Sequence, residues 1–301
     1  MRNGLRAFMK KTILVVQIAF ALLAAPAFAG NDKNFTYLAL GDSIPFGMNI
    51  LLLPPYTTQL PTPFDFTGYP ETVAAAEHLL TSKKEVNASC PGETSGSFLD
   101  VNSPDLGCNT ARVEGNLTLP PFKPTLGLRA DYKDAQMAFV DRELAANKHI
   151  DLITLSIGAN DVLMTVPALE VCGADMTCQQ NVLNPVLDNY VINLTKILTH
   201  IRAKYTGQLV LLQYYSPIPI PLFDGLAQAI NSRMAAVGLQ AAFAPVRIID
   251  GFTAFKTASS SFGGNPCAAG LLIKLPDGTC DVHPSPAGRD LLATIIEVGL
   301  R

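Results

Sequence analysis

Two apolar runs in this sequence end abruptly at a glycine that polar residues follow. Tyr37–Leu40 leads into Gly41, Asp42 and Ser43, and the run 150–157 leads into the segment 158–161, Gly-Ala-Asn-Asp. An uninterrupted apolar run of this length is typical of a strand buried on both faces, as in a parallel sheet between layers of helices. Because ligands bind at the carboxyl ends of such strands, both polar segments are candidate site segments.

Strand and helix patterns alternate along the rest of the chain. The sequence predicts strands over 34–40, 84–88, 150–157, 208–214 and 246–249, and helices over 69–80, 136–146, 182–204, 222–240 and from 286 through 298. The segments 44–68 and 103–125 are rich in proline or turn residues and are expected to be irregular. The alternation predicts an α/β fold with a doubly wound parallel sheet and right-handed crossovers.

The first 29 residues read as a secretory signal rather than as part of the fold. Four basic residues precede the apolar run 13–23, and Ala27-Phe28-Ala29 is a small-x-small cleavage site. The apolar run is shorter than the roughly 20 residues that a membrane span needs. We therefore expect cleavage after Ala29, a single domain over 30–301, and a secreted or periplasmic protein.

Composition limits the partners and suggests an oxidising compartment. A formal net charge of -3 and the lack of a basic run argue against nucleic acid as a partner. Six cysteines fit an exported chain, and fifteen connectivities are open to them. Their order along the chain suggests three local disulfides: Cys90 with Cys108, Cys172 with Cys178, and Cys267 with Cys280. The alternative of a zinc site is disfavoured, because no pair of cysteines and no cysteine–histidine cluster has the spacing of zinc ligands.

Four short segments carry the candidate chemistry. Ser43 stands at the carboxyl end of the first strand, where its hydroxyl is a candidate nucleophile. Gly92 follows the second strand in a Pro-Gly turn, and Asn160 follows the third. His283 precedes a helix that Ser285 caps and Pro286 begins, which predicts a constrained loop around this histidine.

Taken together and in this order, the four segments resemble the GDSL or SGNH hydrolase family of esterases and lipases. Gly41-Asp42-Ser43-Ile44 is similar to the nucleophile block, with Ile44 in the leucine position; Gly92, Gly158-Ala159-Asn160-Asp161 and His283-Pro284 are similar to the other three. The resemblance implies a flavodoxin-like, three-layer α/β/α fold, no metal or other cofactor, and ester hydrolysis through an acyl-enzyme.

The chemistry of these residues agrees with that implication. Serine is a weak nucleophile unless a base lies within hydrogen-bond reach, and His283 is the candidate base for Ser43. The backbone N–H groups of Ser43 and Gly92 and the side-chain amide of Asn160 are candidate oxyanion-hole donors.

The position of the acid departs from the family pattern. The family's aspartate usually stands three residues before the histidine, where this chain has Cys280, while Asp281 stands two before it. Either Asp281 or a backbone carbonyl orients His283, and Asp281 is the slightly favoured candidate. We expect Asp42 to be a turn residue and Asp161 to be a cap or network residue.

Three function hypotheses follow for this chain. The leading one is a secreted lipid-ester hydrolase, with the apolar segments 44–66 and 217–223 as acyl-contact candidates and a transient contact with a lipid surface. The second is a carbohydrate deacetylase of the acetyl-xylan type on the same fold, against which the absence of tryptophan counts. The third is a non-catalytic binding protein.

Overall fold

The computed structural model describes residues 37–76, 85–114, 117–146 and 149–301. All of these residues belong to one compact unit. The predicted signal segment, the predicted strand residues 34–36 and 84, and the predicted helix residues 77–80 lie outside the described residues. None of the described helices is both long enough and apolar enough to cross a membrane.

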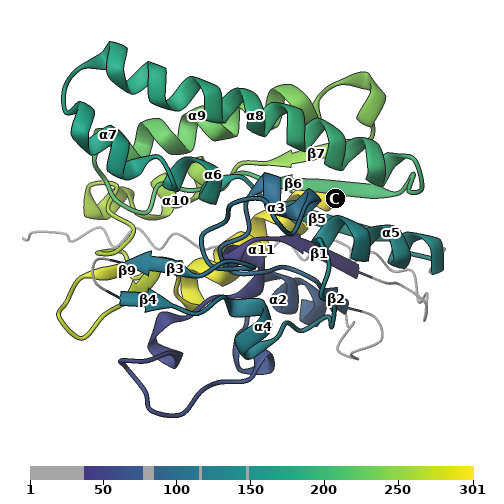
Figure 1. Ribbon diagram of the computed structural model, residues 1–301, viewed down its shortest axis with the longest axis horizontal. Coiled ribbons are helices and arrows are strands. Elements are labelled where there is room, and N and C mark those ends of the chain that lie inside the picture. Colours follow the sequence, from purple (N-terminus) through teal and green to yellow (C-terminus); the bar gives the residue numbers. More distant parts are fainter. Residues whose placement is uncertain (1–36, 77–84, 115–116, 147–148) are drawn as a thin grey trace, which may run out of the picture. The chain divides into compact units, whose positions relative to one another are not determined.

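A five-stranded parallel sheet forms the centre of this unit (Figure 1). Its order is β2-β1-β5-β6-β7, so the five predicted strands lie in the order 2-1-3-4-5 of a flavodoxin-like sheet. The bounds are β1 Tyr37–Gly41, β2 Glu85–Asn87, β5 Leu152–Ser156, β6 Gln208–Leu212 and β7 Val246–Ile249. All five residues of β1 and of β5 are buried, which agrees with the largely apolar segments that predicted these strands.

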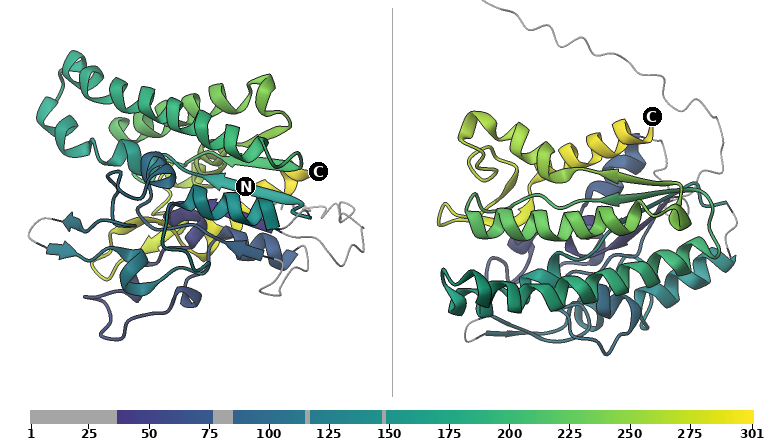
Figure 2. Two further views of the ribbon diagram at one scale, coloured as in Figure 1. Left: turned by 45° about the vertical axis from the view of Figure 1, so that its right-hand side comes forward. Right: turned by 90° about the horizontal axis from the view of Figure 1, so that it is seen from above.

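Helices cover both faces of the sheet (Figure 2). The helices α5, α8 and α9 lie on one face, and α2 and α11 pack together on the other. The bounds are α2 Tyr69–Ala76, α5 Gln136–Ala146, α8 Met176–Arg202, α9 Pro221–Gly238, α10 Gly251–Ala258 and α11 Pro286–Leu300. The predicted α/β fold with a doubly wound parallel sheet is therefore confirmed.

Shorter elements fill the connections. The short helices are α1 Ser43–Phe46, α3 Ser95–Leu99, α4 Phe122–Leu126, α6 Ala159–Leu163 and α7 Val166–Cys172, with 3₁₀ turns at 50–52, 63–65, 241–243 and 260–262. Two antiparallel hairpins pair β3 Arg112–Glu114 with β4 Leu117–Leu119 and β8 Leu272–Lys274 with β9 Cys280–Pro284. The prediction of an irregular segment over 103–125 was therefore wrong, because it contains β3, β4 and α4.

Candidate active site

Ser43 follows β1 through a turn that requires glycine. Gly41 has a φ of 128°, and a Cβ on it would lie 1.9 Å from the carbonyl oxygen of Ser156 on β5. The N–H of Asp42 donates to that same oxygen at 3.1 Å, and its carboxylate accepts from the N–H of Ile44 at 3.0 Å, which caps α1. The turn therefore holds Ser43 at the carboxyl edge of the sheet.

Ser43, His283 and Asp281 form one hydrogen-bonded chain. The Oγ of Ser43 lies 2.9 Å from Nε2 of His283, and Nδ1 of the same ring lies 2.6 Å from Oδ2 of Asp281. An ionised carboxylate only accepts, so Nδ1 carries the hydrogen that it donates to Asp281. Nε2 is then free to accept the hydroxyl proton of Ser43.

The prediction that His283 lies in a loop was wrong, because this residue belongs to β9. Successive side chains on a strand point to opposite faces, so residues two apart share a face. Asp281 and His283 are two apart, and this spacing turns both side chains the same way. The next helix begins as predicted, since Ser285 accepts from the N–H of Gly288 as N-cap and Pro286 is the first residue of α11.

Both members of the Asp281–His283 pair are largely buried, with 12% of each side chain exposed. Burial raises the pKa of Asp281, but the hydrogen bond and the charge interaction with His283 and the N–H groups of Val282 and His283 outweigh it, so the pKa lies below its ordinary value. Asp281 is therefore a carboxylate at neutral pH.

Gly92 and Asn160 come to the same edge of the sheet through β2 and β5. The N–H of Cys90 donates to the carbonyl of Gly41 at 3.0 Å, which ties the Pro-Gly turn to the end of β1. Asn160 donates from Nδ2 to the carbonyl of Glu93 at 2.8 Å, and its second amide hydrogen remains. Among the described residues, the N–H groups of Ser43 and Gly92 donate no hydrogen bond within the protein.

The buried side-chain amide of Gln136 supports both the turn that carries Ser43 and the turn that carries Gly92. The sequence analysis did not identify this residue. Gln136, the first residue of α5, accepts from the N–H of Gly41 at 2.7 Å and donates from Nε2 to the carbonyl of the same residue at 3.0 Å. Its Nε2 also donates to Oε2 of Glu93 at 3.0 Å. The fully buried Glu93, next to Gly92, is therefore linked to the turn that holds Ser43. A polar residue opening an apolar helix face was the available signal.

Two further carboxyls near Ser43 serve the local structure, in the roles expected from the sequence. Burial raises the pKa of Asp42 to about 7, against hydrogen bonds from Tyr214 and Ile44 that lower it; the Tyr214 hydroxyl donates at 2.5 Å. Burial also raises the pKa of Asp161 to about 6, against its hydrogen bonds with Ser95. Asp161 accepts from the N–H and the hydroxyl of Ser95 and links α6 to α3.

The cysteines are paired as their order along the chain suggests. Disulfides join Cys90 to Cys108, Cys172 to Cys178, and Cys267 to Cys280. Cys90, Cys108 and Glu93 lie close enough to one another to surround a metal ion. The two sulfurs are bonded to each other, however, so they lack the thiolate character that metal ligation requires.

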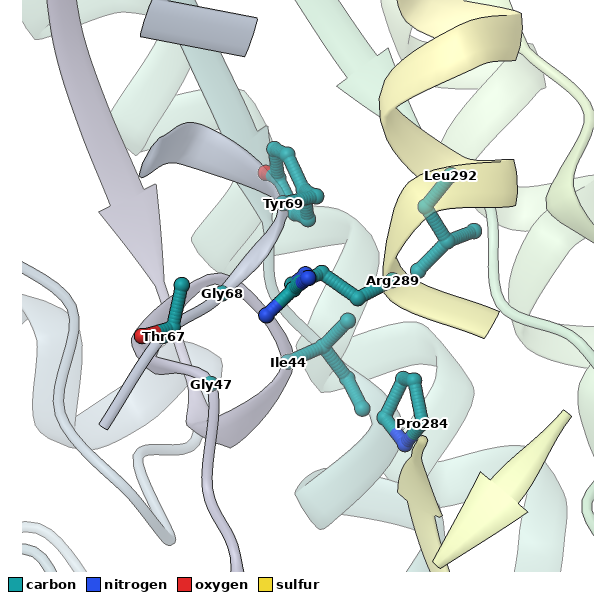
Figure 3. Close-up of a pocket in the computed structure, with 8 residues that line it drawn as sticks. All are labelled: Ile44, Gly47, Thr67, Gly68, Tyr69, Pro284, Arg289 and Leu292. Carbon is teal, nitrogen blue, oxygen red and sulfur yellow. The ribbon is translucent and has the colours of Figure 1, made fainter. Parts of the chain in front are cut away.

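A small pocket is lined by Ile44 and Pro284, the residues that directly follow Ser43 and His283 in the chain (Figure 3). The other residues that line the pocket are Gly47, Thr67, Gly68, Tyr69, Arg289 and Leu292. Its volume of about 10 Å³ is room for about one water molecule, so an acyl chain does not fit there.

The two predicted acyl-contact segments divide between the core and the surface. Phe46 and Phe66 are fully buried, and Met48, Leu52, Leu53 and Leu222 pack against the core. Leu60, Phe64 and Ile220 are exposed. Some apolar residues of the two segments therefore pack in the core, and others are exposed to solvent.

A family model and solved structures both match this chain. Residues 39–291 match the model of the GDSL-like lipase/acylhydrolase family. No curated protein matches the sequence.

Three of the similar solved structures illustrate the shared fold. A lipase from a goat rumen metagenome is 18% identical, with a TM-score of 0.52 and coverage of 88% of this chain and 97% of the other. An extracellular lipase from Streptomyces rimosus is 16% identical, with a TM-score of 0.52 and coverage of 88% and 99%. A catalytic mutant of an acetylxylan esterase from Geobacillus stearothermophilus is 17% identical, with a TM-score of 0.50 and coverage of 88% and 94%.

Proposed function

Since the chain belongs to the GDSL-like lipase/acylhydrolase family and is thus a carboxylic ester hydrolase, we propose that it cleaves acyl esters with Ser43 as nucleophile, His283 as general base and Asp281 as the acid that orients the base. The observation that carries this proposal is the continuous chain from Ser43 Oγ through His283 to Asp281, with distances of 2.9 and 2.6 Å. A serine hydroxyl needs such a base within hydrogen-bond reach to attack a carbonyl carbon.

The reaction proceeds in two halves. Nε2 of His283 takes the proton as Ser43 Oγ bonds to the carbonyl carbon, and the same proton then goes to the departing alcohol oxygen as the ester bond breaks. A water molecule attacks the resulting acyl-enzyme with His283 again as base, which releases the acid and restores Ser43. Asp281 holds the ring in the required tautomer and stabilises the imidazolium.

The negative charge that develops on the carbonyl oxygen needs donors already in position. The N–H groups of Ser43 and Gly92 and the remaining amide hydrogen of Asn160 supply them in this proposal. Each such donor contributes roughly 2.7–4 kcal/mol to the lowering of the barrier in comparable sites. Gln136 and Glu93 hold the two turns that carry these donors.

Lipid-type acyl esters are the favoured substrates. Exposed apolar residues of the segments 44–66 and 217–223 support this assignment, as the site edge offers apolar surface to an acyl chain. A carbohydrate deacetylase is the second candidate, favoured by the fold shared with the acetylxylan esterase and opposed by the absence of tryptophan. A panel of p-nitrophenyl esters from acetate to palmitate separates the two by chain-length preference.

An active-site probe tests the reaction class. A fluorophosphonate should label Ser43 covalently, as mapped by mass spectrometry, and Ser43→Ala should lose the label and all but about a thousandth of the hydrolysis rate. Labelling of a different residue, or inactivity on every ester, would instead favour a non-catalytic binding protein.

Export is the final part of the proposal. The amino-terminal signal and the three disulfides support a secreted or periplasmic location, since disulfides persist in oxidising compartments. A protein recovered from the culture medium or periplasm should begin at Gly30.

A further inference from the structure

Exposed apolar side chains gather on the connections at the carboxyl edge of the sheet. Of the twelve large apolar residues that are exposed in the described part of the chain, eight lie in the connections 47–68, 157–175, 213–220 and 259–270, which follow β1, β5, β6 and α10, and a ninth, Met176, begins α8 directly after the second of them. We call six of them the apolar rim: Leu60, Phe64, Val171, Met176, Ile220 and Phe262, with 56, 67, 88, 63, 44 and 52% exposed.

The rim residues come from four separate connections. Figure 1 shows α7, which carries Val171, and α10, which precedes the 259–270 connection, at the same end of the sheet as β9. Ser43 and His283 also lie at this end, through the carboxyl end of β1 and through β9. Connections that carry rim residues therefore lie at the end of the sheet where Ser43 lies.

Charge narrows what the rim can bind. The connections 47–68, 157–175, 213–220 and 259–270 contain no lysine, arginine or histidine. Their four acidic residues, Asp65, Asp161, Glu170 and Asp175, add no positive charge either. A surface that binds anionic lipid gains attraction from each lysine or arginine, and these connections offer none.

Two basic side chains lie next to the rim connections. Lys256 lies beside Gly264 and is ion-paired with Asp224 at 2.8 Å, and Arg129 lies beside Phe64. The guanidinium of Arg129 is 5.6 Å from the ring centre of Phe64, but it is ion-paired with Glu71 at 3.3 Å and is 16% exposed. Its charge is therefore already balanced within the protein.

We propose that the apolar rim seats the enzyme on an electrically neutral lipid surface, so that Ser43 takes its ester from that surface. This inference rests on the proposed esterase function, for it concerns how the substrate reaches the same serine. A second copy of the chain seated on the rim would cover Ser43, whereas a lipid surface presents the ester to it. Exposed apolar patches at an active-site edge commonly mark such contacts.

The chain supplies matched controls for the test. Val171 and Phe262 belong to the rim, while Leu239 at the end of α9 and Val298 in the last turn of α11 are exposed by 70 and 64% where these helices end, away from the carboxyl edge. The rim variant is Val171→Ser with Phe262→Ser, and the control variant is Leu239→Ser with Val298→Ser.

Binding is measured first, in a Ser43→Ala background so that no lipid is consumed. The affinity for phosphatidylcholine vesicles, measured by cosedimentation, should fall at least tenfold in the rim variant, because two apolar side chains that the lipid would bury are lost. In the control variant the affinity should stay within twofold of the parent. Equal binding of the rim and control variants, or stronger binding to phosphatidylglycerol vesicles than to phosphatidylcholine, overturns the proposal. A change of oligomeric state in the rim variant assigns the rim to a second copy and also overturns it.

Turnover is measured second, with Ser43 intact. The rim variant should hydrolyse dissolved p-nitrophenyl acetate within twofold of the parent rate and lose at least tenfold on an emulsified long-chain ester. Equal loss on both substrates contradicts a role in surface contact. If no ester is cleaved at all while vesicle binding still depends on the rim, the rim assignment stands and the proposed catalytic function fails.

Discussion

At the scale of single residues, the extended backbone of β9 is what brings Asp281 to His283. Asp281→Asn should leave the fold intact and lower kcat on the order of 10⁴-fold, because an amide can donate to Nδ1 and so hold the ring in the wrong tautomer. The measurement is kcat for a dissolved ester, together with the melting temperature.

The hairpin that carries this aspartate also provides a control. Asp277 is fully exposed and accepts from Thr279 on the same hairpin, so Asp277→Asn should leave kcat unchanged. A rate of Asp281→Asn within tenfold of the parent would mean that the histidine is oriented without this carboxylate, as in a Ser43–His283 dyad.

Asn160 provides a second residue-scale prediction. Asn160→Ala should lower kcat by roughly 10²–10³ with little change in KM, because its amide is proposed to act on charge that develops in the transition state. Its other hydrogen bond holds the carbonyl of Glu93, so the melting temperature must be compared as well. A change confined to KM would assign Asn160 to substrate binding.

A site residue can be predicted from the sequence when the residues around it show a recognisable pattern, such as the end of a strand or the start of a helix. Ser43, Gly92 and Asn160 each follow a strand, and Ser285 and Pro286 mark the helix after His283. The local patterns at Gln136 and Tyr214 do not show what these residues do, because their hydrogen-bond partners lie 95 and 172 positions away in the chain. The loop placement of His283 failed since a three-residue partner strand, β8, is too short to show a period of two.

At the scale of elements, the Cys267–Cys280 disulfide closes the segment that leads into β9. Cys280 begins β9 and stands directly before Asp281. Replacing both cysteines by serine should lower the free energy of unfolding by about 3 kcal/mol and should lower kcat below the new melting temperature, because the strand that orients His283 is released.

The Cys172–Cys178 pair is the control, since it joins α7 to α8. It closes a shorter loop, so its double serine variant should lose about 2 kcal/mol and keep kcat. If the variant that lacks Cys267 and Cys280 loses stability but keeps kcat, then this disulfide does not help to position His283.

Elements were predictable in proportion to their length and periodicity. The helix expected over 136–146 has those bounds in the structure, and the five sheet strands overlap the five predicted strand segments. The helix expected from Val182 begins six residues earlier, at Met176, where Asp175 is the N-cap, and it continues through Pro185 as predicted. Helices of five residues such as α3 and α4 bury too few side chains to leave a pattern.

At the scale of the whole molecule, buried carboxyls make stability depend on pH. Burial raises the pKa of Glu93 to about 7, of Asp42 to about 7 and of Asp161 to about 6, and burial and Glu71 raise that of Glu85 to about 8. The folded protein then holds these protons more tightly than the unfolded chain does. These groups contribute their whole share to the free energy of unfolding at pH values below the ordinary carboxyl pKa. That share is lost as the pH rises through their raised pKa values in the folded protein. The free energy of unfolding should therefore be higher at pH 5 than at pH 8.

Glu93 is the group that tests this dependence most directly. A shift of its pKa from 4.5 to about 7 corresponds to a loss of up to about 3 kcal/mol between acid and alkaline pH. Glutamine at this position can still accept from Gln136 and donate to Ser97, so Glu93→Gln should match the parent near pH 4.5 and exceed it in urea-unfolding free energy at pH 8. Glu170→Gln, at an exposed site on α7, should follow the parent at both pH values. A Glu93→Gln variant that loses as much stability as the parent between pH 5 and pH 8 would show that the other buried carboxyls, and not Glu93, carry the dependence.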